Sequence, residues 1–241
     1  SKKIKLKLLS SLINPINNTA VTKQFNLLKK QVSPLIITES IKNLKVYIDM
    51  FLASFIGVGS LSLLGYSERI SNILIAVVIA SLFIVLEIKW SKAFVKDVKI
   101  GINIFQKDIK KMLLFILPMV IFLNVFSNQI ISLIYNYNTT FNESELTLMS
   151  VLLKIYSFGI FGLVLNTAVA RLIAIKGETH IIPKVGISGL ICHLFFGIIL
   201  LNFFALKGLV IASVLSIFIQ TILYFYLLKK PIINLFLLKK N

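Results

Sequence analysis

The sequence has few residues of the kinds that carry out chemistry in enzymes. Its 241 residues include one cysteine, two histidines and only nine acidic residues. The single cysteine, Cys192, excludes an internal disulfide. His180 and His193 belong to no HExxH motif or Cys/His cluster, and the sequence has no phosphate-binding P-loop. The residues therefore predict a protein that is not an enzyme and that carries no metal or cofactor.

Hydrophobic residues, in contrast, are in excess. They make up 57% of the chain, and the mean hydropathy is +0.92, whereas a soluble domain has about 45–50% apolar residues. The excess lies in runs of the length that crosses a bilayer, about 20 residues for a helix. The sequence therefore predicts an all-α, polytopic membrane helix bundle of about six transmembrane helices, at about 34–56, 68–88, 112–134, 148–172, 182–204 and 208–228.

The net charge of +17 does not indicate nucleic-acid binding, because the lysines lie in short segments beside apolar runs. Most of the 26 basic residues lie in 1–33, in 89–111, around Gly177 and after residue 228. With six spans these four segments fall on one side of the membrane, and the acidic, Asn-rich segment 136–147 falls on the other. The positive-inside rule predicts that the basic side, with both termini, is cytoplasmic.

The predicted organisation has three parts. Residues 1–33 form a basic, amphipathic cytoplasmic arm, in which 25–33 is a short helix on the membrane surface. Pro34 opens the first span, a favourable position for proline, and residues 34–230 form the transmembrane lobe. Residues 231–241 are a cytoplasmic tail too short to span. The basic start at Ser1, without a signal peptide, suggests a part of a longer protein.

The predicted first span contains four charged residues, Glu39, Lys42, Lys45 and Asp49. A charge at the bilayer centre costs about 2.5–3.5 kcal/mol on insertion scales. Lys42 and Lys45 lie within about 40° of Asp49 on a helix, so this face is predicted to line a water-filled cavity. The alternative is that Glu39 and Lys42 lie near the helix end, while Lys45 and Asp49 form a structural i,i+4 ion pair.

Polar residues of the other spans have simpler interpretations. Glu68 and Arg69 begin the second span, where a paired interfacial anchor is the usual role. Asn124, Asn166 and Gln220 are expected to make interhelical hydrogen bonds. His193 in the fifth span is more typical of hydrogen-bonded packing than of a proton relay.

Several stretches resemble one transporter family. The run from Asp49 to Phe55, then Gly59-Ser60-Leu61-Ser62 and Tyr66-Ser67-Glu68-Arg69, resembles the MurJ/MviN lipid II flippases, whose seventh helix ends in "ASFL…GSVS" followed by "YADR". These flippases belong to the multidrug/oligosaccharidyl-lipid/polysaccharide exporter superfamily. Further similarities, in the same order as in the family, are Leu117-Pro118, the segment 171–183 with Gly177-Glu178-Thr179, and the segment 208–213.

The resemblance implies the C-terminal lobe of a two-lobe transporter, equivalent to helices seven to twelve of about fourteen. Such proteins move a polyprenyl-diphosphate-linked sugar, here lipid II, across the bacterial cytoplasmic membrane by alternating access. The implied partners are this lipid-linked sugar, the membrane lipids and the missing N-terminal lobe.

The resemblance also implies a substrate site. Arg69 matches an arginine of the family's cationic cavity and would contact the diphosphate, with Lys42 and Lys45 adding to the positive field. The candidate substrate-binding residues are Arg69, Lys45, Lys42, Asp49, Glu39 and Glu68. One departure lies close by, because Asn72 replaces the family's acidic residue.

Two other kinds of function remain open at this point. The first is another branch of the superfamily, an O-antigen or capsule repeat-unit flippase or a drug antiporter. A drug antiporter would favour acidic over basic residues in its cavity, and the candidate residues are balanced between the two. The second is a non-transporting membrane scaffold.

Overall fold

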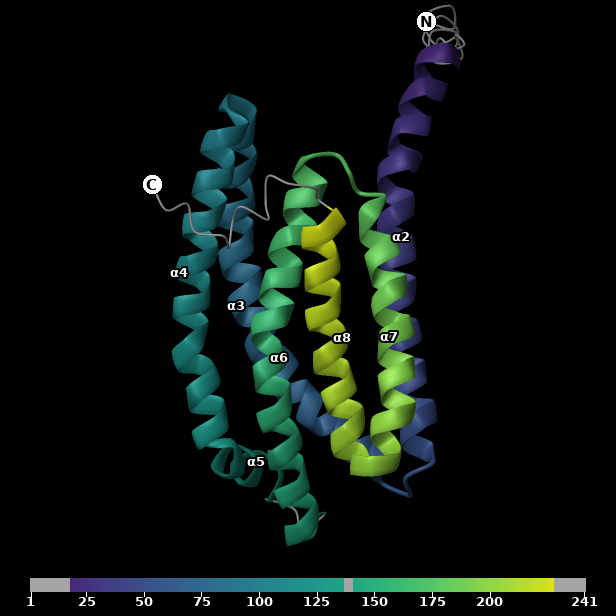
Figure 1. Cartoon of the computed structure of the whole chain (residues 1–241), viewed down its shortest axis with the longest axis vertical. Coiled ribbons are helices and arrows are strands. Elements are labelled where there is room, and N and C mark those ends of the chain that lie inside the picture. The colour runs from purple at the N-terminus through teal and green to yellow at the C-terminus, as the bar shows by residue number, and fades with distance from the viewer. Residues whose placement is uncertain (1–17, 137–140, 228–241) are drawn as a thin grey trace, which may run out of the picture.

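The computed structural model describes residues 18–136 and 141–227, with the backbone alone at 18–31, 35, 74 and 77–81. These residues form an all-helical bundle (Figure 1), which confirms the predicted fold class. The helices are α2 (Asn18–Ser54), α3 (Ser60–Lys96), α4 (Val98–Val125), α5 (Ser127–Tyr135), α6 (Glu143–Ile175), α7 (Ile181–Phe204) and α8 (Leu206–Leu227).

Three of the described helices, α6, α7 and α8, are long and apolar enough to cross a membrane. A fourth span results if α4 and α5 are taken as one span bent by 67°. The other two predicted spans lie within α2 and α3, each of 37 residues and so about 55 Å long. Within the described residues, neither helix is among the candidate spans. Charged residues interrupt the apolar run of α2, and in α3 the side chains of 74 and 77–81 are not described.

The predicted helix start at Pro34 is wrong. Pro34 lies inside α2, so residues 25–33 continue into the same helix and are not a separate one. A proline removes one backbone hydrogen bond and strains the preceding turn, but helix on both sides can persist around it.

The predicted loop at 89–111 is also wrong, because these residues form the end of α3 and the start of α4. The only break is at Asp97, whose backbone is extended. Its carboxylate caps α4 by accepting hydrogen bonds from the N–H groups of Lys99 (2.5 Å) and Ile100 (3.3 Å). A lysine-rich segment has the composition of a loop, but straight-chain residues such as lysine also favour helix.

A buried carboxylate fastens this α3–α4 hairpin. Asp108 of α4 accepts hydrogen bonds from Lys89 Nζ (2.7 Å) and from Trp90 Nε1 (3.0 Å), both on α3. The indole is fully buried and packs edge-on against Phe83 and Phe105. We call this group, Asp108 with Lys89 and Trp90, the hairpin latch.

The predicted third span, 112–134, is interrupted at Phe126, where α4 ends and α5 turns away. Helix α6 packs on α3, α4, α5 and α8, and α2 packs mainly on α7. Helices α7 and α8 approach closely because Gly189 has no side chain. A Cβ atom there would lie 1.9 Å from Nε2 of Gln220, in keeping with the small residues found between membrane helices.

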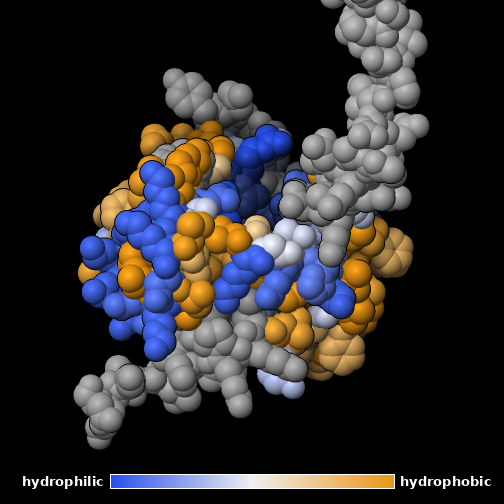
Figure 2. All heavy atoms as spheres, turned by 90° about the horizontal axis from the view of Figure 1, so that it is seen from above, coloured by the Kyte–Doolittle hydropathy of each residue, from blue (hydrophilic) through white to orange (hydrophobic). Residues whose placement is uncertain are grey.

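The two ends of the bundle differ in charge. The start of α2, the α3–α4 hairpin, the α6–α7 connection and the end of α8 all lie at the top in Figure 1. Seen from this basic end, hydrophilic residues gather over the hairpin and apolar residues form the sides (Figure 2). These are the segments that the charge pattern placed on one side, and which side faces the cytoplasm remains a prediction.

Candidate functional site

A polar cavity of about 410 Å³ lies between α2, α3, α6 and α8. We call it the central cavity. The polar residues that line it are Lys42 and Lys45 of α2, Glu68, Ser71 and Asn72 of α3, Tyr156, Asn166 and Thr167 of α6, and Ser213, Ser216 and Gln220 of α8. Polar side chains from four helices thus converge inside an otherwise apolar bundle, as expected of a solute pathway.

The polar face of α2 divides into two parts. Lys42 and Lys45 line the central cavity, whereas Asp49 is buried and is not among its lining residues. Lys45 Nζ donates to Asp49 Oδ2 over 2.8 Å, which is the i,i+4 ion pair of the alternative interpretation. Lys42 pairs with Glu39 over 2.7 Å, with both side chains about two-thirds exposed. The cavity wall and the ion pair therefore exist together and share Lys45.

Asp49 has a second partner on another helix. His193 Nε2 of α7 lies 2.6 Å from Asp49 Oδ1, and the histidine side chain is 1% exposed. This contact gives His193 the hydrogen-bond partner that a buried histidine in a membrane span is expected to have. Its partner is 144 residues away in sequence, so neither spacing nor composition could identify the pair. The other ring nitrogen, Nδ1, is buried and has no hydrogen-bond partner among the described residues.

Glu68 and Arg69 have different positions. Glu68 lines the central cavity. Arg69 is exposed, is not among the residues that line the cavity, and lies close enough to Tyr135 of α5 to interact electrostatically with it. The two residues form no ion pair with each other within the described structure, so the expected paired anchor is absent there. The structure therefore brings Lys42, Lys45 and Glu68 together and leaves Arg69 outside.

The expected interhelical hydrogen bonds are present. Asn124 Nδ2 of α4 donates to Ser157 Oγ of α6 over 2.5 Å. Asn166 Nδ2 of α6 lies 3.5 Å from Gln220 Oε1 of α8. Asn166 and Gln220 also line the central cavity, so they both connect two helices and contribute to its wall.

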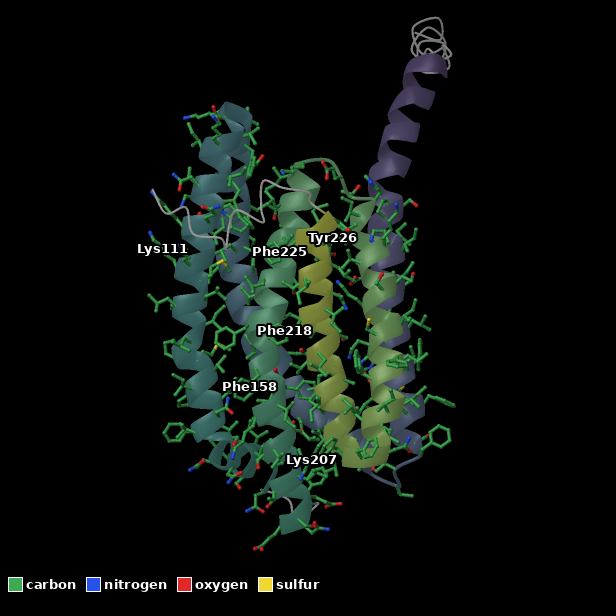
Figure 3. All side chains as sticks on the ribbon, in the orientation of Figure 1. Lys111, Phe158, Lys207, Phe218, Phe225 and Tyr226 are labelled. Atoms are coloured by element: carbon green, nitrogen blue, oxygen red, sulfur yellow. The ribbon has the colours of Figure 1, made fainter. Side chains whose placement is uncertain are left out.

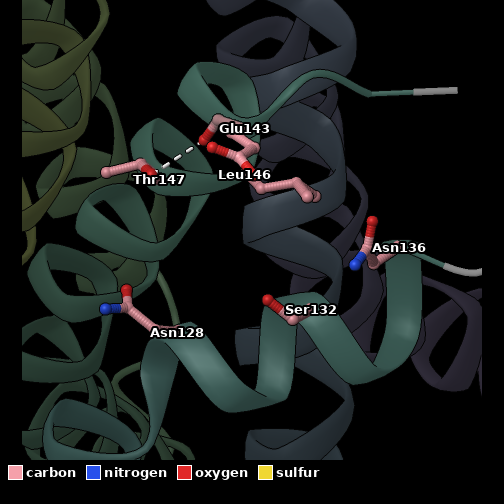
Figure 4. A pocket seen from close by; sticks show the side chains of 6 residues that line it. All are labelled: Asn128, Ser132, Asn136, Glu143, Leu146 and Thr147. Carbon is pink, nitrogen blue, oxygen red and sulfur yellow. Dashed lines mark hydrogen bonds between the residues drawn. The ribbon is translucent and has the colours of Figure 1, made fainter. Parts of the chain in front are cut away.

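A second polar pocket, of about 310 Å³, lies at the opposite end between α5 and α6 (Figure 4). Its lining residues are Asn128, Ser132, Asn136, Glu143, Leu146 and Thr147. This pocket has amides, hydroxyls and one carboxylate but no cation, so it does not fit an anionic group. Lys207, the second residue of α8, also lies at this end (Figure 3) and is not among the residues that line the central cavity.

The family model for lipid II flippase MurJ matches residues 4–239. The chain belongs to the lipid II flippase MurJ family. No curated protein sequence matches it. The MurJ family consists of membrane transporters, and the described helices fit that class.

Solved structures agree on the fold. A lipid II flippase MurJ in an inward closed conformation has a TM-score of 0.71 at 21% identity, over 88% of this chain and 45% of that one. A Vibrio cholerae MATE transporter has a TM-score of 0.72 at 12% identity, over 96% and 52%. A transporter of the MOP superfamily from Pyrococcus furiosus, described as having a binding pocket of reverse polarity, has 0.61 at 17% identity, over 85% and 44%. The chain thus spans about half the length of these transporters.

Proposed function

We propose that this chain is the C-terminal lobe of a flippase that moves lipid II across the bacterial cytoplasmic membrane by alternating access. The proposal rests on the family match and on one observation, the pair of lysines in the central cavity. Two ammonium groups line this wall beside the carboxylate of Glu68, and each can donate charge-assisted hydrogen bonds to a diphosphate linked to a polyprenol. The N-terminal lobe, outside this chain, would supply the other wall.

The positions of the charges weigh against a drug antiporter. The sequence alone left three acidic and three basic candidates in balance. Of these, Lys42, Lys45 and Glu68 line the cavity, while the negative charge of Asp49 is compensated by Lys45. A cationic drug would meet two ammonium groups and a single carboxylate, that of Glu68, among the side chains that line this wall. An O-antigen or capsule repeat unit has the same diphosphate, so it remains the alternative substrate.

Depletion of the complete protein tests the substrate. We expect lipid II to accumulate on the cytoplasmic leaflet and the cells to lyse. Accumulation of an O-antigen or capsule unit with normal lipid II would reassign the protein to that branch of the superfamily. If no lipid-linked sugar accumulates, the flippase proposal is wrong and an antiporter or a scaffold takes its place.

The lysines are tested in the complete protein by Lys42→Met and Lys45→Met, with Lys207→Met as the matched control. A charge-assisted hydrogen bond contributes about 1.5–3 kcal/mol, so each cavity variant should lower the affinity for a polyprenyl diphosphate about 10- to 100-fold. Lys207 is exposed at the opposite end and should be neutral. Arg69→Ala is the third variant, because the family resemblance assigns Arg69 to the substrate whereas the described cavity excludes it.

A further inference from the structure

Asp49 has a strong partner on each carboxylate oxygen. Lys45 Nζ lies 2.8 Å from Oδ2, and His193 Nε2 lies 2.6 Å from Oδ1. The aspartate and the histidine are both buried. The positive charge of Lys45 cancels the negative charge of Asp49, so a neutral His193 completes a cluster without net charge. Neutrality matters here because an uncompensated charge inside a membrane protein is strongly unfavourable.

One atom of this cluster has no partner. The short contact between His193 Nε2 and Asp49 Oδ1 requires one proton between the two atoms. The other ring nitrogen, His193 Nδ1, is buried and makes no hydrogen bond within the described residues. Buried polar atoms are nearly always paired, and an unpaired one calls for an explanation. A nitrogen that gains and loses a proton provides one.

Lys45 connects the cluster to the central cavity. Its side chain is 26% exposed and lines the cavity beside Lys42, so its ammonium group is accessible to an anion there. An anion that draws Lys45 away leaves Asp49 with His193 as its remaining partner. The buried carboxylate is then uncompensated, unless the pair takes up a proton.

We propose that His193 and Asp49 form a proton-binding site that is coupled through Lys45 to anion binding in the central cavity. One proton moves from water to His193 Nδ1 as one diphosphate binds Lys45, and it returns to water when the diphosphate leaves. No other bond is made or broken. The coupling to diphosphate rests on the proposed function, whereas the proton site itself rests on the cluster alone.

Among the titratable groups near His193 in the described residues, Asp49 is the carboxylate in direct contact with the imidazole. Tyr156 of α6 is close enough to both Asp49 and Glu68 of α3 to interact electrostatically with them. The titratable side chains of α8 lie near its ends, at Lys207, Tyr224 and Tyr226. Cys192 precedes His193 on α7 itself. Within the described residues, the ion pairs of this region are those of Asp49 with Lys45 and His193, and of Glu39 with Lys42.

The test is nitrogen NMR of histidine in the complete protein, reconstituted in lipid nanodiscs. His193→Gln and His180→Gln assign the two histidine signals of this chain. At a fixed pH near 7, Lys45→Met should raise the imidazolium fraction of His193 about twofold or more, because Asp49 loses its other cation. Lys45→Gln is a second neutral variant in case the first does not fold. Lys45→Arg keeps the charge, and Lys42→Met removes a lysine that does not contact Asp49, so both should leave the fraction unchanged.

The same signal then reports the coupling when a polyprenyl diphosphate is added to the unmutated protein. We expect the imidazolium fraction of His193 to rise, and no further rise in Lys45→Met. An unchanged fraction in both neutral Lys45 variants, or an equal change in Lys42→Met, would overturn the proton site. A response to Lys45 variants without a response to diphosphate would uphold the proton site and reject Lys45 as the diphosphate contact.

Discussion

Two buried aspartates, Asp108 and Asp49, have nearly the same surroundings and yet differ in one respect. Each is about 5–6% exposed and joins two helices. Each accepts a hydrogen bond from a lysine Nζ, at 2.7 and 2.8 Å, and lies within hydrogen-bond distance of a ring nitrogen, at 3.0 and 2.6 Å. Asp108 contacts an indole, which has one nitrogen and is always a donor. Asp49 contacts an imidazole, which has a second nitrogen, Nδ1, without a hydrogen-bond partner in the described residues.

The lysines differ as well. Lys89 is 48% exposed at the basic end, outside the central cavity, whereas Lys45 lines that cavity. In the hairpin latch, therefore, the indole cannot change its protonation, and Lys89 is not among the residues that an anion in the central cavity would meet. The Asp49 cluster can exchange its lysine and its proton. The contact distances of the two aspartates are similar, so distance alone does not separate a structural charge from a functional one. The comparison indicates that the accessibility of the paired lysine and the proton chemistry of the ring partner separate them.

The largest expected effect on stability is at the latch. Asp108→Ala removes both acceptors of Lys89 and leaves the buried indole Nε1 of Trp90 unpaired. We expect the free energy of unfolding to fall by about 3 kcal/mol, since breaking a buried pair leaves uncompensated polar groups. Thermal unfolding in detergent, followed by fluorescence, measures the change. A loss below that of Asp49→Asn would contradict the assignment of Asp108 as the fixed member of the comparison.

Asp49→Asn should cost less, about 1.5 kcal/mol. The new amide oxygen can still accept from His193 Nε2, and Lys45 can be hydrated in the cavity. The functional effect should be larger than the structural one, because the proton site loses its carboxylate. Stability and polyprenyl-diphosphate affinity are measured on the same preparation, and an intact pH dependence of that affinity would show that Asp49 does not take part.

The helix cap at Asp97 and the hairpin latch at Asp108 belong to the same hairpin. Asp97→Ala measures the contribution of the cap to stability separately from that of the latch. The cap of α4 consists of two hydrogen bonds to one exposed carboxylate, and loss of an N-cap costs about 1 kcal/mol. The comparison of its thermal unfolding with that of Asp108→Ala shows whether the hairpin depends mainly on the buried pair. Equal losses would mean that the turn, and not the latch, holds α3 against α4.

The smallest expected change in stability is that of His193→Gln, within about 0.5 kcal/mol, because the amide keeps one donor for Asp49. This substitution converts the Asp49 cluster into the fixed type seen at Asp108. Polyprenyl-diphosphate affinity should therefore lose the part of its pH dependence that comes from His193. Affinity that strengthens equally on acidification in the variant and the parent would place the responsible proton elsewhere.

Sequence alone predicted the apolar helices best. The predicted spans 182–204 and 208–228 match α7 and α8 within two residues, because each is an uninterrupted apolar run beside a tight turn. The bend at Phe126 and the helical segment 89–111 were missed. Neither has a distinctive local composition, and the hairpin is held by the tertiary contact of Asp108 with Trp90.

In the candidate site, too, contacts within one helix were predictable from the sequence and contacts between distant helices were not. Lys45 and Asp49 were paired correctly because four residues separate them on one helix. His193 was recognised as a packing residue, but its partner on α2 depends on how two distant helices meet. Arg69 was selected by resemblance, which aligns a residue with a family position but does not place its side chain in this lobe.

The latch has a mechanical consequence. With a break of one residue at Asp97, the hairpin tip is a stiff extension of two membrane helices and moves with them. From the middle of α3 to its end is about 27 Å. A rigid-body rotation of about 15°, typical of large switching transitions, would therefore displace the tip by about 7 Å. A spin label at the exposed hairpin tip would therefore report the rotation of the whole lobe. The label would lie outside the membrane, far from the substrate.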